Sequence, residues 1–167
     1  MSTLAPLLAE LREEAATTKR VLERVPADKL AWRPHAKSMT LGQLALHVAT
    51  IPGNIASMAQ LQEFDASQAN FEPPAPRDAA EIWAAFDQSV KAAEDMIGEM
   101  SDESAVANWR LTLHGKELFA KPRLAILRSL MMNHWYHHRG QLSVYLRLLD
   151  VPVPVIYGRS ADENPFA

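Results

Sequence analysis

Two histidines one helical turn apart are the residues of this chain whose type and spacing best suit chemistry. His134 and His138 lie in the amphipathic stretch 133–141, together with His137. Successive residues of an α-helix turn by about 100° and rise about 1.5 Å, so His134 and His138 point within about 40° of each other. Helical zinc sites use this i, i+4 spacing to hold one ion. The stretch therefore indicates a metal site on a helix.

A third histidine, His47, lies in a second amphipathic stretch, residues 41–49. An imidazole that faces a core needs a hydrogen-bond partner or a metal, because burying an unsatisfied polar group costs about 1–3 kcal/mol. Spacing alone leaves two pairs open, since His134 shares a helix face with both His138 and His137. The competing interpretation is that each ring is an ordinary core histidine with a hydrogen-bond partner.

The remaining two histidines, His35 and His114, fall outside the periodic segments. We predict that both lie in loops as ordinary exposed residues. The candidate metal site is thereby limited to the histidines of the two amphipathic stretches.

Four periodic segments must position these histidines. Apolar residues recur at spacings of three and four, which predicts helices over residues 3–25, 40–61, 78–101 and 122–149. A short hairpin is predicted over 108–120, and an irregular strap over the proline-containing tail 151–167. Four helices of this length with one or two long connections favour an all-α fold, a four-helix bundle with antiparallel neighbours.

The ends and the interior of these helices carry local signals. Thr40 with Gln43, and Asp78 with Glu81, have the form of a capping box at a helix start. Pro52 falls inside the second helix, where it removes a backbone donor. We expect the carbonyl four residues earlier to lose its normal partner and the helix to kink there.

Length and composition bound the class of protein. The 167 residues predict a single domain, residues 1–167. A net charge of −3 without a basic stripe argues against nucleic acid as a partner. No apolar run approaches 18 residues, and the first residues lack a signal pattern, so we expect no membrane span and a cytoplasmic location. Because the chain has no cysteine, a metal site must use His, Asp or Glu.

Several motifs taken together resemble the DinB/YfiT-like family of bacterial proteins. They are Trp32-Arg33-Pro34, the segment 40–44 followed by His47, the segment 134–141, and Tyr157-Gly158 near the end. The likeness covers residues 5 to 160. It implies a bundle with up-down-down-up topology and a divalent metal held by three histidines. Carried over by position, these ligands are His47, His134 and His138, which makes His137 a neighbour.

Such a site would leave a dication with its full charge and an open coordination position. Zinc and nickel are the expected ions, and iron and manganese also accept such ligands, because imidazole binds them all. No carboxylate accompanies the histidines, which argues against a metalloprotease that needs a glutamate base. The resemblance implies a thiol S-transferase in which a metal-bound thiolate attacks an electrophile. The alternatives are a metal-dependent hydrolase, a non-enzymatic stress-related metal-binding protein, and a helical interaction module.

The imidazoles of a metal site need outer partners for their second nitrogens. Nearby candidates are Gln43, Asn133, Arg139 and Gln141, and Arg139 could also bind an anionic substrate group. For each of them a solvated or helix-capping role is the competing interpretation.

Three aromatic residues lie off the main apolar stripes. They are Trp83, Trp135 and Tyr136. Large exposed aromatic side chains beside a helix seam often mark an interface, so we predict a homodimer.

Overall fold

The structure is a computed structural model that describes residues 2–70 and 72–166. Its long helices are α1 (Ala5–Leu22), α2 (Leu41–Gln60) and α3 (Ala79–Glu99), followed by the short α4 (Asp102–Val106). A last helical stretch runs without interruption through α5 (Arg123–Ile126), η3 (Leu127–Asn133) and α6 (His134–Leu148). The strands are β1 (Glu63–Asp65), β2 (Asn108–Leu113) and β3 (Lys116–Pro122). The prediction of a mostly helical chain with a small β excursion is confirmed.

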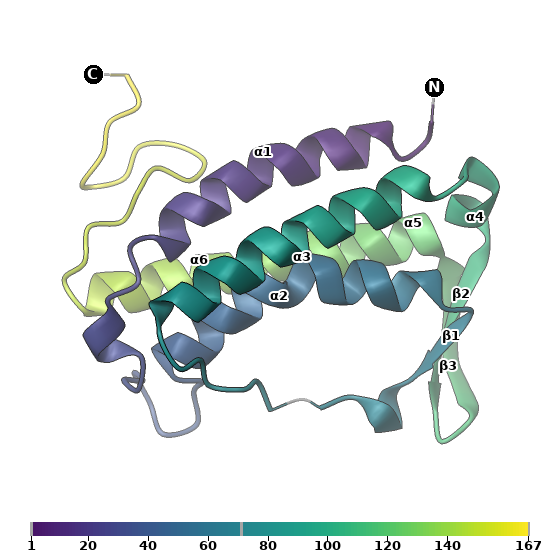
Figure 1. Cartoon of the computed structure of the whole chain (residues 1–167), viewed down its shortest axis with the longest axis horizontal. Coiled ribbons are helices and arrows are strands. Elements are labelled where there is room, and N and C mark those ends of the chain that lie inside the picture. The colour runs from purple at the N-terminus through teal and green to yellow at the C-terminus, as the bar shows by residue number, and fades with distance from the viewer. Residues whose placement is uncertain (1, 71, 167) are drawn as a thin grey trace.

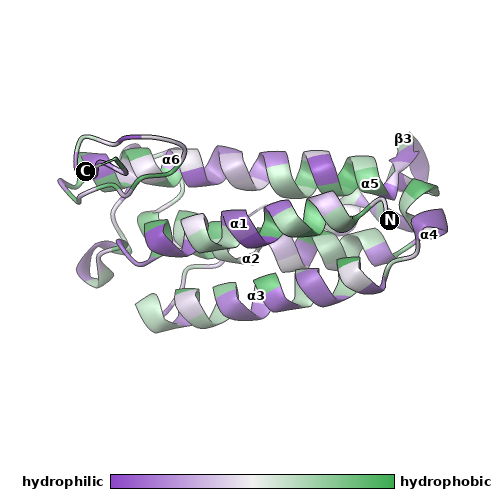
Figure 2. Cartoon of the chain, turned by 90° about the horizontal axis from the view of Figure 1, so that it is seen from above, coloured by the Kyte–Doolittle hydropathy of each residue, from purple (hydrophilic) through white to green (hydrophobic). Residues whose placement is uncertain are grey.

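The long helices lie side by side, and the sheet closes one end. In Figure 1, α1, α2, α3 and the α5–α6 stretch follow the long axis, while α4 and the strands gather where α2 ends. Buried leucine, isoleucine, valine and alanine side chains from all of these helices form the core. Figure 2 shows hydrophobic and hydrophilic residues alternating around each helix, as expected when one face is buried. None of the described helices is long and apolar enough to cross a membrane.

The sheet has one strand more than the predicted hairpin. β2 and β3 pair antiparallel, and their turn places His114 and Gly115 at positive φ. β1 joins the other edge of β2 in parallel, with Phe64 opposite Leu111. The Asp65 carboxylate accepts hydrogen bonds from the backbone N–H groups of both turn residues, at 3.1 and 2.8 Å. A strand of three residues carries no periodic signal, so the sequence did not predict β1.

The predicted starts of α2 and α3 are found in the structure. Thr40 forms a full capping box: its hydroxyl accepts from the Gln43 N–H, and the Gln43 side chain accepts from the Thr40 N–H. Asp78 caps α3 by accepting from the Glu81 N–H, but the Glu81 carboxylate accepts from the Arg77 N–H instead of closing the box. These polar residues fix where each helix begins, and α2 carries His47.

The last helix differs from the uniform α-helix that its sequence predicts. Residues Leu127–Asn133 form a wide π-helical turn, and α6 begins directly afterwards at His134. The short helix α4 was also missed, because its five residues are too few to show a helical period. Both differences arise where tertiary packing outweighs local propensity.

Helix α2 continues through Pro52, and its backbone is satisfied by another helix. The proline has no N–H for the Val48 carbonyl, as the sequence predicts. The buried indole of Trp135 donates to that carbonyl at 2.9 Å and so replaces the missing donor. At the next residue, Gly53, helix α3 comes so close that an added Cβ would lie 3.0 Å from the backbone of Ser89. The middle of α2 is therefore held between α3 and α6.

The tail after α6 packs as the irregular strap that its prolines predict. Val151, Val153 and Ile156 lie against the core. Glu163 accepts hydrogen bonds from Arg20 and Arg24 of the first helical segment at 2.5 and 3.0 Å. The described part of the strap is thus fastened by both apolar contacts and ion pairs.

Replacing Trp135 by Phe should lower the free energy of unfolding by about 1–3 kcal/mol beyond any lost packing, because it leaves the Val48 carbonyl without a donor. In a Pro52→Ala background, the new N–H of residue 52 can bond Val48, so the same change should cost less. Denaturant unfolding of the four proteins gives the coupling between the two sites. Equal costs of Trp135→Phe in both backgrounds would contradict this account.

Candidate metal centre

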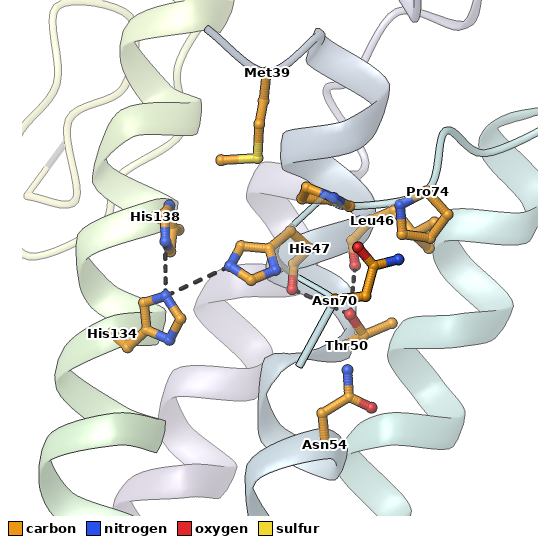
Figure 3. Close-up of a pocket in the computed structure, with 10 residues that line it drawn as sticks. Met39, Leu46, His47, Thr50, Asn54, Asn70, Pro74, His134 and His138 are labelled. Carbon is orange, nitrogen blue, oxygen red and sulfur yellow. Dashed lines mark hydrogen bonds between the residues drawn. The ribbon is translucent and has the colours of Figure 1, made fainter. Parts of the chain in front are cut away.

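The structure brings three of the six histidines together. His134 and His138 project from adjacent turns of α6, and His47 projects from α2 toward them (Figure 3). The Nε2 atom of His134 lies 2.8 Å from Nε2 of His138 and 3.5 Å from Nε2 of His47. Ligand atoms of all three rings lie within 4.8 Å of one another. Three nitrogens from two rigid helices thus converge on one point.

The other three histidines lie outside this group. His137 is exposed and does not belong to the group, although it lies on the same helix and its ring centroid is 4.9 Å from that of His138. His35 and His114 are exposed in the segments that were predicted as loops. Of the two pairs that the spacing leaves open, the structure therefore favours His134 with His138.

One of the rings has an outer partner within hydrogen-bond distance. The Nδ1 atom of His138 lies 2.7 Å from Oε1 of Gln141, so it donates to that oxygen and leaves Nε2 as an acceptor. For His134, an interaction with the backbone of Leu130 raises the pKa against the larger lowering by burial. Among the predicted outer partners, Gln141 is in place.

The Nε2 atoms of His134 and His138 face each other. Nε2 of His138 is an acceptor and lies 2.8 Å from Nε2 of His134, so either a proton on His134 or a cation must lie between the two nitrogens. Tetrahedral zinc with bonds of about 2.0–2.1 Å holds its nitrogens roughly 3.3 Å apart, and the observed 2.8 and 3.5 Å lie on either side of that value. The donor set therefore fits a divalent ion.

The environment keeps the three rings neutral. Burial, followed by repulsion from the charged forms of His138 and His134, lowers the pKa of His47 from 6.5 to about 4. Burial also lowers the pKa values of His134 and His138, against the opposing effects of their Leu130 and Gln141 hydrogen bonds. Metal ligation requires neutral imidazole, so protons compete weakly at this site.

The convergence point opens into a pocket of about 610 Å³. The pocket lining combines the apolar side chains of Met39 and Leu46 with the polar side chains of Thr50, Asn54 and Asn70 (Figure 3). Pro73 and Pro74 complete the rim. Among the described lining residues, the three histidines are the only titratable groups. A small molecule can therefore reach the ring nitrogens through a pocket without charged side chains.

The sequence did not identify the residues of this pocket wall. Asn54 follows His47 by seven residues, which places both on one face of α2, and this spacing was a usable signal. Asn70 and the two prolines come from a connector without periodicity. The capping residue Gln43 holds this connector, because its side-chain amide donates to the Pro73 carbonyl at 2.9 Å. Gln43 therefore shapes the pocket rim and is not an outer partner of a histidine.

Arg139 does not serve as an anion-binding group in the pocket. Its side chain is 1% exposed and pairs with Glu14 at 2.5 Å, and it donates to the Thr18 hydroxyl at 3.0 Å. Tyr136 and Tyr157 flank its guanidinium, with ring centroids at 5.4 and 5.0 Å. The arginine joins α6 to α1 and the strap, so its predicted role toward substrate is wrong.

Two of the three aromatic residues assigned to a dimer interface also lie inside. Trp135 is fully buried, and Tyr136 is half-buried with its hydroxyl donating to Glu10 at 2.6 Å. Trp83 is exposed on α3. The homodimer stays a prediction, and of these three residues only Trp83 supports it.

The arrangement defines a class, a mostly helical protein in which histidines from two helices form a group that could hold a metal ion. Residues 1–164 match the DinB family, and the chain belongs to that family. It is 27% identical over 161 residues to the Bacillus subtilis protein YrdA, covering 96% of this chain and 92% of that protein. The predicted family is thereby confirmed.

Solved structures show the same fold at low identity. A DinB-like protein from Bacillus cereus superposes with a TM-score of 0.69 at 24% identity, covering 90% of this chain and 95% of the other. The DinB-like protein YjoA from Bacillus subtilis gives a TM-score of 0.70 at 17% identity, covering 93% and 99%. A protein from Exiguobacterium sibiricum, described as a member of the DinB family, gives 0.66 at 19%, covering 93% and 97%. These likenesses establish the fold alone.

The depressed pKa of His47 predicts how stability depends on pH in the metal-free protein. Between pH 6.5 and about 4 the unfolded chain binds a proton at residue 47 that the folded chain does not. The free energy of unfolding should therefore fall as the pH falls through this window and level off below it. Denaturant unfolding at a series of pH values measures the slope. His47→Gln should flatten it, and an unchanged slope in that variant would contradict the assigned cause.

Proposed function

We propose that this DinB-family chain is a metal-dependent enzyme in which His47, His134 and His138 hold a divalent ion, zinc or nickel first and iron or manganese second. The observation that carries the proposal is the convergence of three imidazole nitrogens in a half-buried pocket. The ring of His138 is already oriented by Gln141, which lowers the cost of binding an ion.

The proposed reaction is transfer of a low-molecular-weight thiol to an electrophile. A divalent ion with three neutral ligands keeps its full charge and supplies the Lewis acidity that lowers the pKa of a thiol or water. The thiol gives its proton to solvent, its sulfur forms a bond to an electrophilic carbon, and the leaving group departs with the bonding pair. No described lining residue is a carboxylate that could serve as a general base, which suits a nucleophile already deprotonated at neutral pH.

The pocket walls indicate the kind of electrophile. Apolar groups of Met39 and Leu46 and the amides of Asn54 and Asn70 line the site together. Asn70 uses its oxygen to accept from the Glu72 N–H at 3.0 Å, which leaves its amide N–H groups for a ligand. An uncharged molecule with one apolar edge and one hydrogen-bond acceptor matches these walls. Charged parts of the thiol would stay on the solvent side.

The architecture belongs to the same proposal. We assign α1, α2, α3 and the α5–α6 stretch to a four-helix bundle of up-down-down-up topology in one domain, with α4 and the sheet as additions at one end. In this arrangement His47 comes from the second helix of the bundle, and the other two ligands come from the fourth. We also retain the homodimer and the cytoplasmic location as predictions.

Alanine at any one of His47, His134 and His138 should abolish stoichiometric metal binding, because two imidazoles alone hold a dication poorly. Elemental analysis of purified protein after loading with zinc or nickel measures the metal content. The matched control is His137→Ala, which removes a histidine from the same helix and should keep full metal content. Retention of metal in the three variants, or its loss only in the control, would refute the ligand assignment.

The loaded protein should accelerate conjugation of bacillithiol, mycothiol or glutathione to a chlorodinitrobenzene, with release of chloride. His47→Ala should reduce the rate to the background of thiol and electrophile alone. If wild type and variant give equal rates with all three thiols, the transferase assignment fails. Metal-dependent ester or amide hydrolysis would then support the hydrolase, and no activity with retained metal would support a metal-binding stress-related protein.

A further inference from the structure

The wide turn η3 lies directly before the histidine pair, and we propose that it is a positioning element of this site. In this proposal the turn takes up one extra residue of the helix and thereby moves His134 and His138 from core positions to the edge of the pocket. The inference rests on the proposed metal site and adds a determinant outside the ligands. Single π-type turns inside helices frequently accompany functional sites.

The burial pattern shows by how much the wide turn rotates the buried face of the helix. Every fourth residue from 123 to 139 is buried: Arg123, Leu127, Met131, Trp135 and Arg139. In an uninterrupted α-helix, 16 residues at about 100° each would place the last of these roughly 160° from the first, almost on the opposite face. One residue absorbed by the wide turn removes about 100° of that difference. The turn therefore lets Trp135 and Arg139 enter the core.

This rotation of the helix by the wide turn decides where His134 and His138 lie. If the stripe of the preceding turns continued as an α-helix, these two histidines would occupy the core positions. With the wide turn, their neighbours Trp135 and Arg139 take those positions, and the histidines move to the pocket edge. The π-helical turn thus converts two core positions into two half-buried ones that a ligand can reach.

Deletion of Ser129 tests the proposal. Ser129 is an exposed residue of the wide turn, and its hydroxyl donates to the Ala125 carbonyl at 2.7 Å. Without it, Arg123 and Arg139 are 15 residues apart, which an ordinary α-helix places within about 60° of each other. The shortened chain can therefore keep its core while losing the wide turn. The matched control, Ser129→Ala, loses only the hydroxyl and keeps the turn.

The first readout needs no metal. Diethyl pyrocarbonate acylates neutral imidazoles that solvent can reach, and mass spectrometry of the peptides reports the rate at each histidine. His134 and His138 should react in wild type and in Ser129→Ala, with the exposed His137 as internal reference, and should react more slowly in the deletion variant. Protection of both rings in the metal-free wild type would overturn the proposal even if the deletion variant failed to fold.

The second readout is metal affinity. Titration with nickel should show affinity about ten- to a hundredfold weaker for the deletion variant and unchanged for Ser129→Ala, the range typical when the orientation of a ligand is lost. A folded deletion variant with wild-type reactivity and wild-type affinity would overturn the proposal. If wild type binds no divalent ion, the proposed function fails, and the modification measurement still decides whether the wide turn places the histidine pair at the pocket edge.

Discussion

The contact on which the rest of the site depends is the hydrogen bond from the Trp135 indole to the Val48 carbonyl. It joins α2 to α6 at residues next to His47 and His134, so it fixes the separation of the two helices at the level of the histidines. Its acceptor exists because Pro52 takes away the normal donor. Pro52, which would weaken an isolated helix, thus leaves a carbonyl free to bond the neighbouring helix. The buried hydrogen bond between Trp135 and Val48 offsets the free energy lost with the backbone hydrogen bond.

That anchor explains why Trp135 lies in the core while the histidines beside it do not. Trp135 must reach the backbone of α2 and so determines which face of α6 points inward, since each neighbouring residue is rotated by about 100° around the helix axis. Arg139, one turn later, also points inward and pairs with Glu14. A buried arginine without such a partner would be strongly destabilising. The two inward residues therefore hold α6 on both sides of its exposed histidine, His137.

The sequence predicted most of what depends on local pattern. Helix positions, the Thr40 capping box, the lost donor at Pro52 and the family all follow from spacing and motifs that are visible in the chain. What it missed depends on partners that are distant in sequence. We assumed a regular α-helical period and therefore predicted Trp135 and Tyr136 on the outside and Arg139 near the substrate. Residues 127–133 contain no sequence signal for a wide turn. The sequence also missed the strand β1 and the pocket wall from the 70–74 connector. Each of them is held by residues more than 25 positions away.

The histidines and the opposite pocket wall come from parts of the fold that differ in how tightly they are packed, which suggests where the specificity of the site arises. The histidines come from two helices that are fixed by buried contacts, so the position of a bound ion is set by the core. The opposite wall comes partly from a connector that is held at Pro73 by one side-chain bond from Gln43. Connectors tolerate substitution better than packed helices. Proteins that share this fold at 17–24% identity can thus keep the packed helices while their connectors diverge. If the proposed function holds, we expect the residues around Asn70 and Pro73, more than the three histidines, to determine which electrophile is accepted.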